Sequence, residues 1–328
     1  MARNRRIGIT TTIPLEPLVA ASVVPVDLNN FFMDSKSPIQ HVEEAQVRGF
    51  PRNICTWIKG LYTASADVDL VVGVVRGDCS NTESLLETLG SEGKPVHPFS
   101  YPYDRSRDAI IAEIEDLCSL LGCTMEEAEQ TSGRLQELRN IALSIDEQRW
   151  RDLSISAEDC HFSLVSTSDL CSDPERWERH LRSILERGRT NSPQDEGVRL
   201  GYIGVPPIIT DIFTRIEGSG ARTVLFEVQR QFAMPSKTGD WIGRYLDYTY
   251  PYDIAGRVED IKAEVKRRRI EGLVHYVQSF CHRQIDDIIF RHKLDVPILT
   301  LEGNLPGPMD ERTLIRLESF IDVLEEGG

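Results

Sequence analysis

The 328-residue chain lacks the features of several common classes of protein. No run of about 18 apolar residues occurs, which excludes a transmembrane helix. The N-terminus is basic but lacks the apolar stretch of a signal peptide. Basic residues are scarce, with 37 Lys and Arg against 52 Asp and Glu, so a nucleic-acid partner is not expected. We therefore expect a soluble, cytoplasmic protein that binds neither membranes nor nucleic acid.

The seven cysteines have neither the number nor the spacing of a disulfide framework or a local metal site. Their number is odd and no secretion signal accompanies them, which argues against complete disulfide pairing. No CxxC pair occurs, so the ligand spacing of zinc ribbons and ferredoxins is absent. A cysteine metal site would have to gather its ligands from distant segments. The cysteines are Cys55, Cys79, Cys118, Cys123, Cys160, Cys171 and Cys281.

The hydropathy pattern is that of a globular α/β protein in which strands alternate with helices. Hydrophobic residues make up 40% of the chain, and its length suits two compact units or one large domain. The stretch VDLVVGVV (68–75) is almost entirely apolar, as in a parallel strand that is covered on both faces. The strands expected in the first part of the chain are Arg6–Thr12, Val23–Leu28, Val68–Val75 and Lys94–Tyr101. The helices expected between them are 14–21, 55–63 and 81–89.

The chain becomes helical after residue 105, and an α/β pattern returns after the linker-like run TNSPQDE (190–196). We expect an N-terminal α/β domain over 1–104, a helical and connecting region over 105–195, and a C-terminal α/β domain over 196–328. The strands expected in the last region are Val198–Val205, Arg222–Val228, Leu273–Val277 and Val296–Leu301. The helices expected there are Ile208–Glu217, Ile254–Arg269, His282–His292 and Asp310–Leu324.

Three cysteines lie where open parallel sheets bind ligands, beyond the carboxyl end of an expected strand or at the start of a helix. Cys79 follows the strand 68–75, Cys281 follows the strand 273–277, and Cys55 opens a helix. Separations of 24 and 202 residues show that this is not a local motif. Three converging thiolates would suit an iron–sulfur cluster with one iron open to a non-protein ligand. Buried structural thiols are the alternative.

Seven segments, in order, resemble 2-hydroxyacyl-CoA dehydratase subunits, a superfamily that includes benzoyl-CoA reductase-type subunits and double-cubane cluster proteins. The similarity extends from about residue 7 to residue 325 and is weakest over 105–195. Its most specific parts are the isolated cysteine in each of three segments and the C-terminal segment. The segments are GITTTIPLEPLVAASVVPVDLN, NICTWIKG, DLVVGVVRGDCSNT, GYIGVPPIITDIFTRIEGSGARTVLFE, YTYPYDIAGRVEDI, EGLVHYVQSFCHRQ and VPILTLEGNLPGPMDERTLIRLESF.

The resemblance implies an α/β fold with two Rossmann-like (flavodoxin-like) parallel-sheet domains and a helical insertion, and a 4Fe–4S cluster between the domains. Matched segment by segment, the cluster ligands would be Cys55, Cys79 and Cys281. The fourth iron would take substrate, water or hydroxide, or a sulfide that bridges a pair of cubanes. The resemblance also implies a separate ATP-hydrolysing iron–sulfur activator protein. The chain has no GxxxxGK[ST] motif, which agrees with hydrolysis by that partner.

Within this superfamily the chain looks closest to the double-cubane branch. It is short, and it lacks the helical stretch that dehydratase subunits carry ahead of the first matching segment. The basic run KRRR (266–269) is expected to be a solvated helix face rather than a site for the phosphates of coenzyme A. We therefore expect a homodimeric iron–sulfur reductase of a small molecule. The alternatives are a subunit of a 2-hydroxyacyl-CoA dehydratase or aryl-CoA reductase, and a non-catalytic electron-transfer or cluster-scaffold component.

Three further residues are candidates for catalysis. His282, next to a candidate ligand, could donate a proton or a hydrogen bond, or could be an exposed residue of a first helical turn. Glu302 follows a strand, where an active-site acid would lie, but it could equally cap a helix or pair with Arg312 or Arg316. Glu227 has a similar position at the end of the strand VLFE.

Other reactive side chains have simpler explanations. The tyrosines of YTYPY (248–252) are expected to be packing and turn residues. Cys118 and Cys123, in the helical region, are expected to be small buried side chains. Cys160 and Cys171 could ligate a second cubane, with unligated thiols as the alternative.

Overall fold

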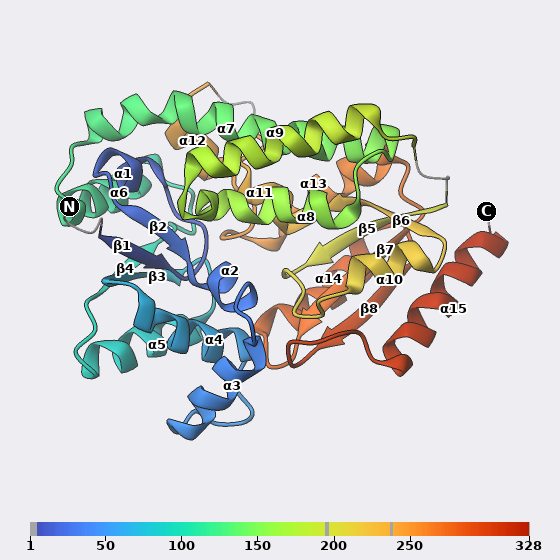
Figure 1. Cartoon of the computed structure of the whole chain (residues 1–328), viewed down its shortest axis with the longest axis horizontal. Helices are drawn as coiled ribbons and strands as arrows, with labels where there is room; N and C mark the ends of the chain where they lie inside the picture. The colour runs from blue at the N-terminus through green and yellow to red at the C-terminus, as the bar shows by residue number, and fades with distance from the viewer. Residues whose placement is uncertain (1–4, 194–196, 237–238, 328) are drawn as a thin grey trace. The chain divides into compact units, whose positions relative to one another are not determined.

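The computed structural model describes residues 5–193, 197–236 and 239–327 and divides into two compact units (Figure 1). The expected linker 190–196 therefore lies partly outside the described residues. Both units have an α/β architecture, as predicted, whereas the division into three consecutive regions stays a prediction. Unit 1 comprises Met1–Asn140, Ser166–Glu178 and Phe232–Asp253. Unit 2 comprises Ile141–Val165, Arg179–Gln231 and Ile254–Gly328.

Unit 1 contains a four-stranded parallel sheet with the strand order β2-β1-β3-β4. Each expected strand is present, although the first ends three residues earlier than predicted, at Ile9. The apolar stretch of β3 is buried from Leu70 to Val74, because helices cover both faces of the sheet. The strands are β1 (Arg6–Ile9), β2 (Val24–Asp27), β3 (Leu70–Arg76) and β4 (Val96–Ser100).

The helices of unit 1 lie on both faces of its sheet, with α4 and α5 together on one and α1 and α6 on the other (Figure 1). Helices α2 and α3 are not predicted from the sequence. Only Val42 and Ala45 of α3 are buried, so this helix has little apolar periodicity. The helices are α1 (Glu16–Ala20), α2 (Leu28–Met33), α3 (Pro38–Val47), α4 (Thr56–Ala64), η1 (Ser65–Asp67), α5 (Ser80–Ser91), α6 (Arg107–Leu121), η2 (Ser166–Ser168), η3 (Leu170–Ser172) and α12 (Trp241–Asp247).

Unit 2 repeats this arrangement, with a parallel sheet of strand order β6-β5-β7-β8. Every residue of β7 is buried, which matches its predicted place inside the sheet. The four strands agree with the expected ones to within a few residues. They are β5 (Val198–Gly204), β6 (Ala221–Phe226), β7 (Gly272–Gln278) and β8 (Ile298–Gly303).

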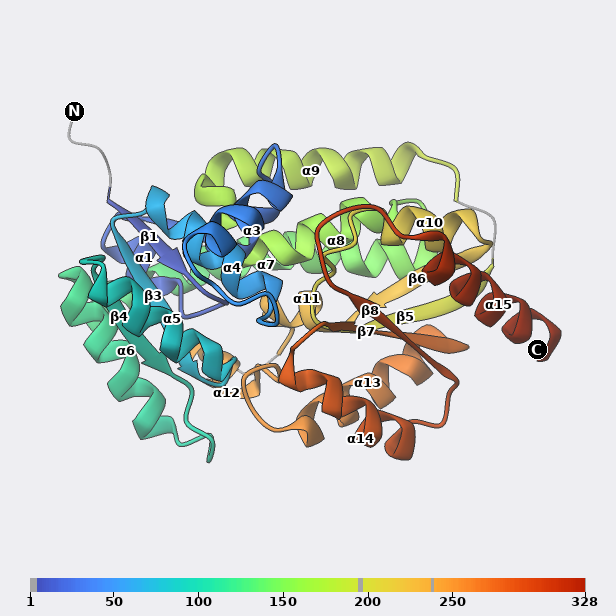
Figure 2. The same cartoon turned by 90° about the horizontal axis from the view of Figure 1, so that it is seen from below.

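Figure 2 shows α13 and α14 together on one face of the sheet of unit 2. No helix in the described part of the chain is long and apolar enough to cross a membrane. The helices of unit 2 are α8 (Ala157–Val165), α10 (Ile212–Gly218), α11 (Glu227–Phe232), α13 (Ile254–Arg268), η4 (His282–Ile285), α14 (Asp286–Lys293) and α15 (Glu311–Gly327). Two longer helices pass along the chain from one unit into the other, α7 (Met125–Asp152) and α9 (Pro174–Thr190).

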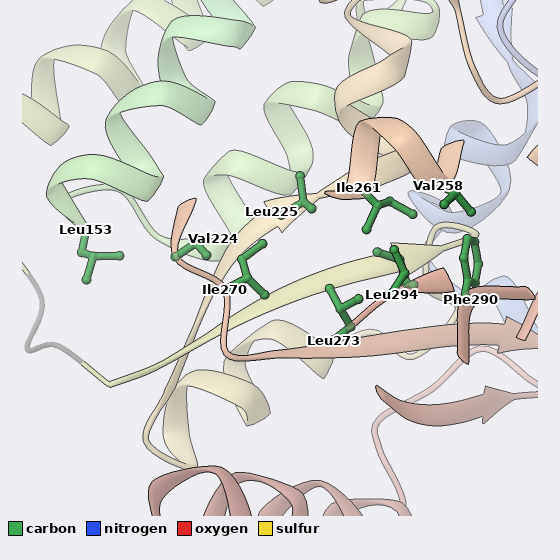
Figure 3. Close-up of a cluster of buried hydrophobic side chains, with 10 residues drawn as sticks. Leu153, Val224, Leu225, Val258, Ile261, Ile270, Leu273, Phe290 and Leu294 are labelled. Atoms are coloured by element: carbon green, nitrogen blue, oxygen red, sulfur yellow. The ribbon is translucent and has the colours of Figure 1, made fainter. Parts of the chain in front are cut away.

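The face of the unit 2 sheet that carries α13 and α14 is closed by an apolar cluster (Figure 3). Val258 and Ile261 of α13 and Phe290 of α14 meet side chains of β6 and β7, and each is at most 4% exposed. Burial of one such side chain contributes about 1.5–3 kcal/mol. This packing fixes both helices against the sheet.

Arg268 is a buried charge in the same unit. Its guanidinium is 0% exposed and bonds to both carboxylate oxygens of Asp146, at 2.7 and 2.6 Å, and to Glu264 at 2.5 Å. The prediction that 266–269 is a solvated helix face is therefore wrong for Arg268. Arg267 also bonds to Glu264, and together these hydrogen bonds outweigh burial and lower the pKa of Glu264 to about 2.

We predict that alanine destabilises the fold at Gly60 in α4 and stabilises it at Gly133 in α7. A Cβ at Gly60 would lie 2.5 Å from the buried ring of Phe32, and overpacking of this kind costs about 1–3 kcal/mol. A Cβ at Gly133 would meet no atom within 4 Å, so the helix propensity of alanine adds up to about 1 kcal/mol. Urea unfolding of Gly60→Ala and Gly133→Ala measures both changes. Changes of the same sign in the two variants would contradict this account of α4 packing.

Candidate functional site

Each of the three candidate cysteine ligands is the residue directly before a helix. Cys55 precedes α4 and Cys79 precedes α5 in unit 1, and Cys281 precedes η4 in unit 2. All three have extended backbones, with φ between −88° and −51° and ψ between 132° and 136°. The first N–H groups of a helix have no partners within the helix, so a side chain at this position can accept a hydrogen bond from them. The same groups favour negative charge, which suits a thiolate.

One of these thiols makes the expected contact with its helix. The backbone N–H of Asn81 donates to Sγ of Cys79 at 3.4 Å, so the cysteine caps α5. Burial of Cys55 is nearly complete, at 6% exposed, while Cys79 and Cys281 are partly accessible. The sulfur atoms are therefore near the surface of their own units without being fully solvated.

Cys79 and Cys281 have corresponding positions in the two units. Strands β3 and β7 occupy the same place in sheets of the same order, and each cysteine is the third residue beyond its strand. This is the carboxyl edge at which open α/β sheets bind ligands.

The donor set is compatible with an iron–sulfur cluster. All seven cysteines, each in the described part of the chain, are thiols rather than disulfides. Within the described residues, no three His, Cys, Asp or Glu side chains form a group that could hold a metal ion. Cys55 and Cys79 belong to one unit and Cys281 belongs to the other, so the ligand set as a whole stays a prediction.

Cys281 borders a narrow crevice in unit 2 that is too tight to hold a water molecule, at the carboxyl ends of β5 and β7. Its lining includes Gly204, Arg257, His275 and Gln284. Gly204 has a φ of +98°, and a Cβ there would lie 2.1 Å from the backbone oxygen of Tyr276. Only glycine therefore allows β5 to end against β7 in this way.

A turn next to Cys281 is fixed by strand β8. The N–H of Cys281 donates to the backbone oxygen of Gln278 at 3.0 Å, and the intervening Phe280 has a φ of +65°. This left-handed conformation is strained for a bulky residue. The side chain of Ser279 donates to Glu302 at 2.6 Å, and its N–H donates to the backbone oxygen of Gly303 at 2.8 Å. These contacts hold the turn in place.

The three candidate catalytic residues have different surroundings. Glu302 bonds to Ser279, so it supports the turn before Cys281, and Arg316 donates instead to the backbone of Thr300. Partial burial and then the charge of Arg283 lower the pKa of His282, which leaves the imidazole neutral near pH 7. The roles of Glu302 and His282 in catalysis stay predictions.

Glu227 is completely buried and binds an arginine. Its two carboxylate oxygens accept hydrogen bonds from Nε and Nη2 of Arg257 at 2.8 and 2.9 Å, and one of them also accepts the N–H of Gly204 at 3.2 Å. Both oxygens of this carboxylate are engaged by these partners, so the geometry favours a structural role over proton transfer.

His275 is a buried histidine that the sequence analysis does not single out. It is 1% exposed in β7, and its Nδ1 lies 2.8 Å from Oδ1 of Asp287. Burial would raise the pKa of Asp287, but hydrogen bonds from His275, Thr300 and Arg291 lower it to about 2. The signal that could have identified His275 is a histidine inside the apolar strand LVHYV that leads to Cys281.

The remaining four cysteines differ in their surroundings, and ligation of a second cubane by Cys160 or Cys171 stays a prediction. Burial raises the pKa of Cys160 well above its usual value, and loss of hydration and the carboxylate of Asp169 raise the pKa of Cys171 to about 12. Cys118 is 3% exposed, and burial raises its pKa to about 12, as suits the predicted packing role. Sγ of Cys123 lies 3.5 Å from the backbone oxygen of Pro17.

The tyrosines of 248–252 are packing residues, as predicted. All three are at most 8% exposed, and Tyr248 and Tyr252 contact the ring of Tyr101 edge to face, with centroids 5.9 and 5.8 Å apart. The hydroxyl of Tyr250 lies 3.4 Å from Oδ1 of Asp78, the residue before Cys79. The cluster therefore supports the turn that precedes Cys79.

A comparison with protein families gives a match over almost the whole chain. The family model described as 2-hydroxyglutaryl-CoA dehydratase, D-component, matches residues 10–324. This range contains all three candidate cysteine ligands. No curated protein matches the sequence.

Two buried aspartates make the stability of unit 1 depend on pH. The N–H of Asp27 donates to the carboxylate of Asp169 at 2.8 Å. Burial and then the charge of Asp27 raise the pKa of Asp169 to about 8, and burial also raises the pKa of Asp27. The folded chain thus retains protons that the unfolded chain releases above pH 4 or so.

We predict that Asp169→Asn weakens the pH dependence of unfolding. A carboxyl group whose folded pKa is raised contributes stability at low pH, and this contribution is lost as pH rises from about 4 to about 8. The free energy of unfolding of the unchanged chain should therefore fall between pH 5 and pH 8, and that of the variant should fall less. Urea titrations at the two pH values measure this. An unaltered pH dependence in the variant would show that Asp169 does not carry the buried proton.

Proposed function

Because the chain belongs to the 2-hydroxyglutaryl-CoA dehydratase D-component family, we propose that it is the catalytic subunit of an iron–sulfur reductase. Cys55, Cys79 and Cys281 bind a 4Fe–4S cluster or one cubane of a sulfide-bridged pair, and the chain acts as a homodimer. A separate ATP-hydrolysing iron–sulfur activator supplies the electrons. The observation that carries the proposal is that each of the three cysteines has an extended backbone directly before a helix, within the range that the family model matches.

The residues of this chain supply ligation and electrostatic support. Three thiolates leave one iron open to a substrate or a bridging ligand, the arrangement that distinguishes reactive metal sites from closed structural ones. The N–H groups at the helix starts stabilise the negative sulfurs, as the contact from Asn81 to Cys79 illustrates. When bound, the cluster supplies one-electron reduction at low potential.

The surroundings of one basic segment bear on the choice between a small substrate and an acyl-CoA. Two of the four basic residues of 266–269, Arg267 and Arg268, bond to Glu264 and Asp146, while Lys266 and Arg269 are exposed. Arginines with these partners do not offer charge to a nucleotide. These two arginines therefore give no support to an acyl-CoA substrate.

A dehydratase subunit is the second candidate, and the description of the matching family favours it. Such a subunit requires a different partner chain and binds an acyl-CoA. Size-exclusion chromatography and titration with acyl-CoA separate the two candidates. A homodimer without acyl-CoA binding supports the reductase.

We predict that Cys55→Ser, Cys79→Ser and Cys281→Ser each lower the iron and sulfide content severalfold after anaerobic purification, because each removes one thiolate ligand. Cys123→Ser is the control, because its Sγ lies within 3.5 Å of the backbone oxygen of Pro17 and serine can keep that contact. Iron and acid-labile sulfide per chain are the measured quantities. Full occupancy in all three test variants would overturn the assignment.

A further inference from the structure

The chain directly after Cys281 leads within a few residues to two aspartates. The helix η4 occupies residues 282–285, and α14 then begins with Asp286 and Asp287. The N–H of Gln284 donates to the backbone oxygen of Cys281 at 3.2 Å, so the short helix couples the cysteine to the start of α14. Contacts that hold these two aspartates in place therefore also restrain the position of Cys281.

Asp286 is connected to the sheet through Arg257. Oδ2 of Asp286 accepts a hydrogen bond from Nη1 of Arg257 at 2.9 Å. Arg257 is 1% exposed, and its other two nitrogens bind Glu227, which in turn accepts the N–H of Gly204. The chain of contacts runs from the end of β5 through α11 and α13 to the start of α14.

Asp287 is connected to the sheet by a second set of contacts. Its Oδ1 lies 2.8 Å from Nδ1 of His275 on β7 and accepts the hydroxyl of Thr300 on β8 at 2.5 Å. Its Oδ2 accepts Nε of Arg291 at 2.6 Å. Two neighbouring strands thus hold this carboxylate.

Both sets of contacts reach the crevice that Cys281 borders. Arg257 and His275 line it together with the cysteine, and both pack against the ring of Phe290, with Arg257 5.3 Å above its centroid. The charged contacts therefore lie directly behind the segment that carries the thiol. Buried charges with full sets of partners have little freedom to move.

We propose that Asp286 and Asp287 are positioning residues for Cys281, and that Arg257 and His275 hold them in place. The inference rests on the proposed function, because it concerns the geometry of one cluster ligand. Groups that orient metal ligands from outside typically change metal affinity about 10–100-fold when they are replaced. If the two aspartates had only a structural role, replacing them should change the stability of the fold and leave metal affinity unchanged.

The unit contains a matched control. Asp146 bonds to the buried Arg268 through both carboxylate oxygens, and Asp286 bonds to the buried Arg257 through one, so each is a carboxylate partner of a buried arginine in the same unit. Within the described part of the chain, the hydrogen bonds of Asp146 join it to Arg268 rather than to η4 or the first turn of α14. Asp146→Asn therefore removes a carboxylate partner of a buried arginine without touching the segment of Cys281.

The test uses full-length, cluster-loaded Asp286→Asn, Asp287→Asn and Asp146→Asn. We expect all three to lose unfolding free energy, but only the first two to release iron to a chelator about 10–100-fold faster than the unchanged protein. The same two should alter the EPR spectrum of the reduced protein. If Asp287→Asn does not fold, His275→Gln removes the other end of the same contact.

Two outcomes would overturn the inference: iron release from Asp286→Asn and Asp287→Asn that equals that of the unchanged protein, or equal acceleration in Asp146→Asn. Failure of the proposed function gives a different result. In that case the unchanged protein holds no cluster, or Cys281→Ser keeps it. Loss of the cluster in Cys281→Ser with unchanged release in the aspartate variants refutes the positioning role alone.

Discussion

Parallel pairing of strands that are covered on both faces is the constraint on which the structure depends. Parallel neighbours need a crossover, so every strand of a sheet ends at the same edge, and the connections at that edge are available for chemistry. In unit 1 this edge carries Cys79 and in unit 2 it carries Cys281, each at the same distance beyond a buried strand. The position of the thiols follows from the sheets rather than from a local motif.

Buried arginines paired with carboxylates are the second recurring feature. Arg139, Arg257 and Arg268 are each at most 1% exposed and bond to a buried carboxylate within their own unit. Removing one partner of such a pair leaves an uncompensated buried charge, which costs about 3–5 kcal/mol. The pairs therefore fix the relative positions of distant segments within a unit. In unit 2, one of them lies directly behind Cys281.

The strands, and the places of the candidate cysteines beyond them, could be predicted because they depend on short stretches of sequence. The apolar run at 68–75 and the strand before Cys281 are visible as patterns, and the cysteines follow from their places beyond these strands. Helix α3 was missed because it buries few side chains. This helix forms without an apolar stripe, so the periodicity of hydrophobic residues gives no signal for it.

The hydrogen bonds and ion pairs around the candidate site could not be predicted, because the residues that make them are distant in sequence. Glu227 looked like an acid at a strand end, but Arg257, 30 residues away, binds both of its oxygens. Asp287 meets His275 across 12 residues and a change from strand to helix. Similarly, Arg268 is part of a basic run in the sequence, and only the folded chain brings Asp146 to it. Pairings of this kind are set by tertiary packing, for which one sequence holds no local signal.

The most direct test of the central claim is an iron and sulfide count on the unchanged chain after anaerobic purification, with EPR before and after ATP-dependent reduction by the activator. The account predicts about four irons and four sulfides per chain for a single cubane, or about twice that for a bridged pair, with a signal that appears on reduction. A stable, folded chain without iron would contradict it.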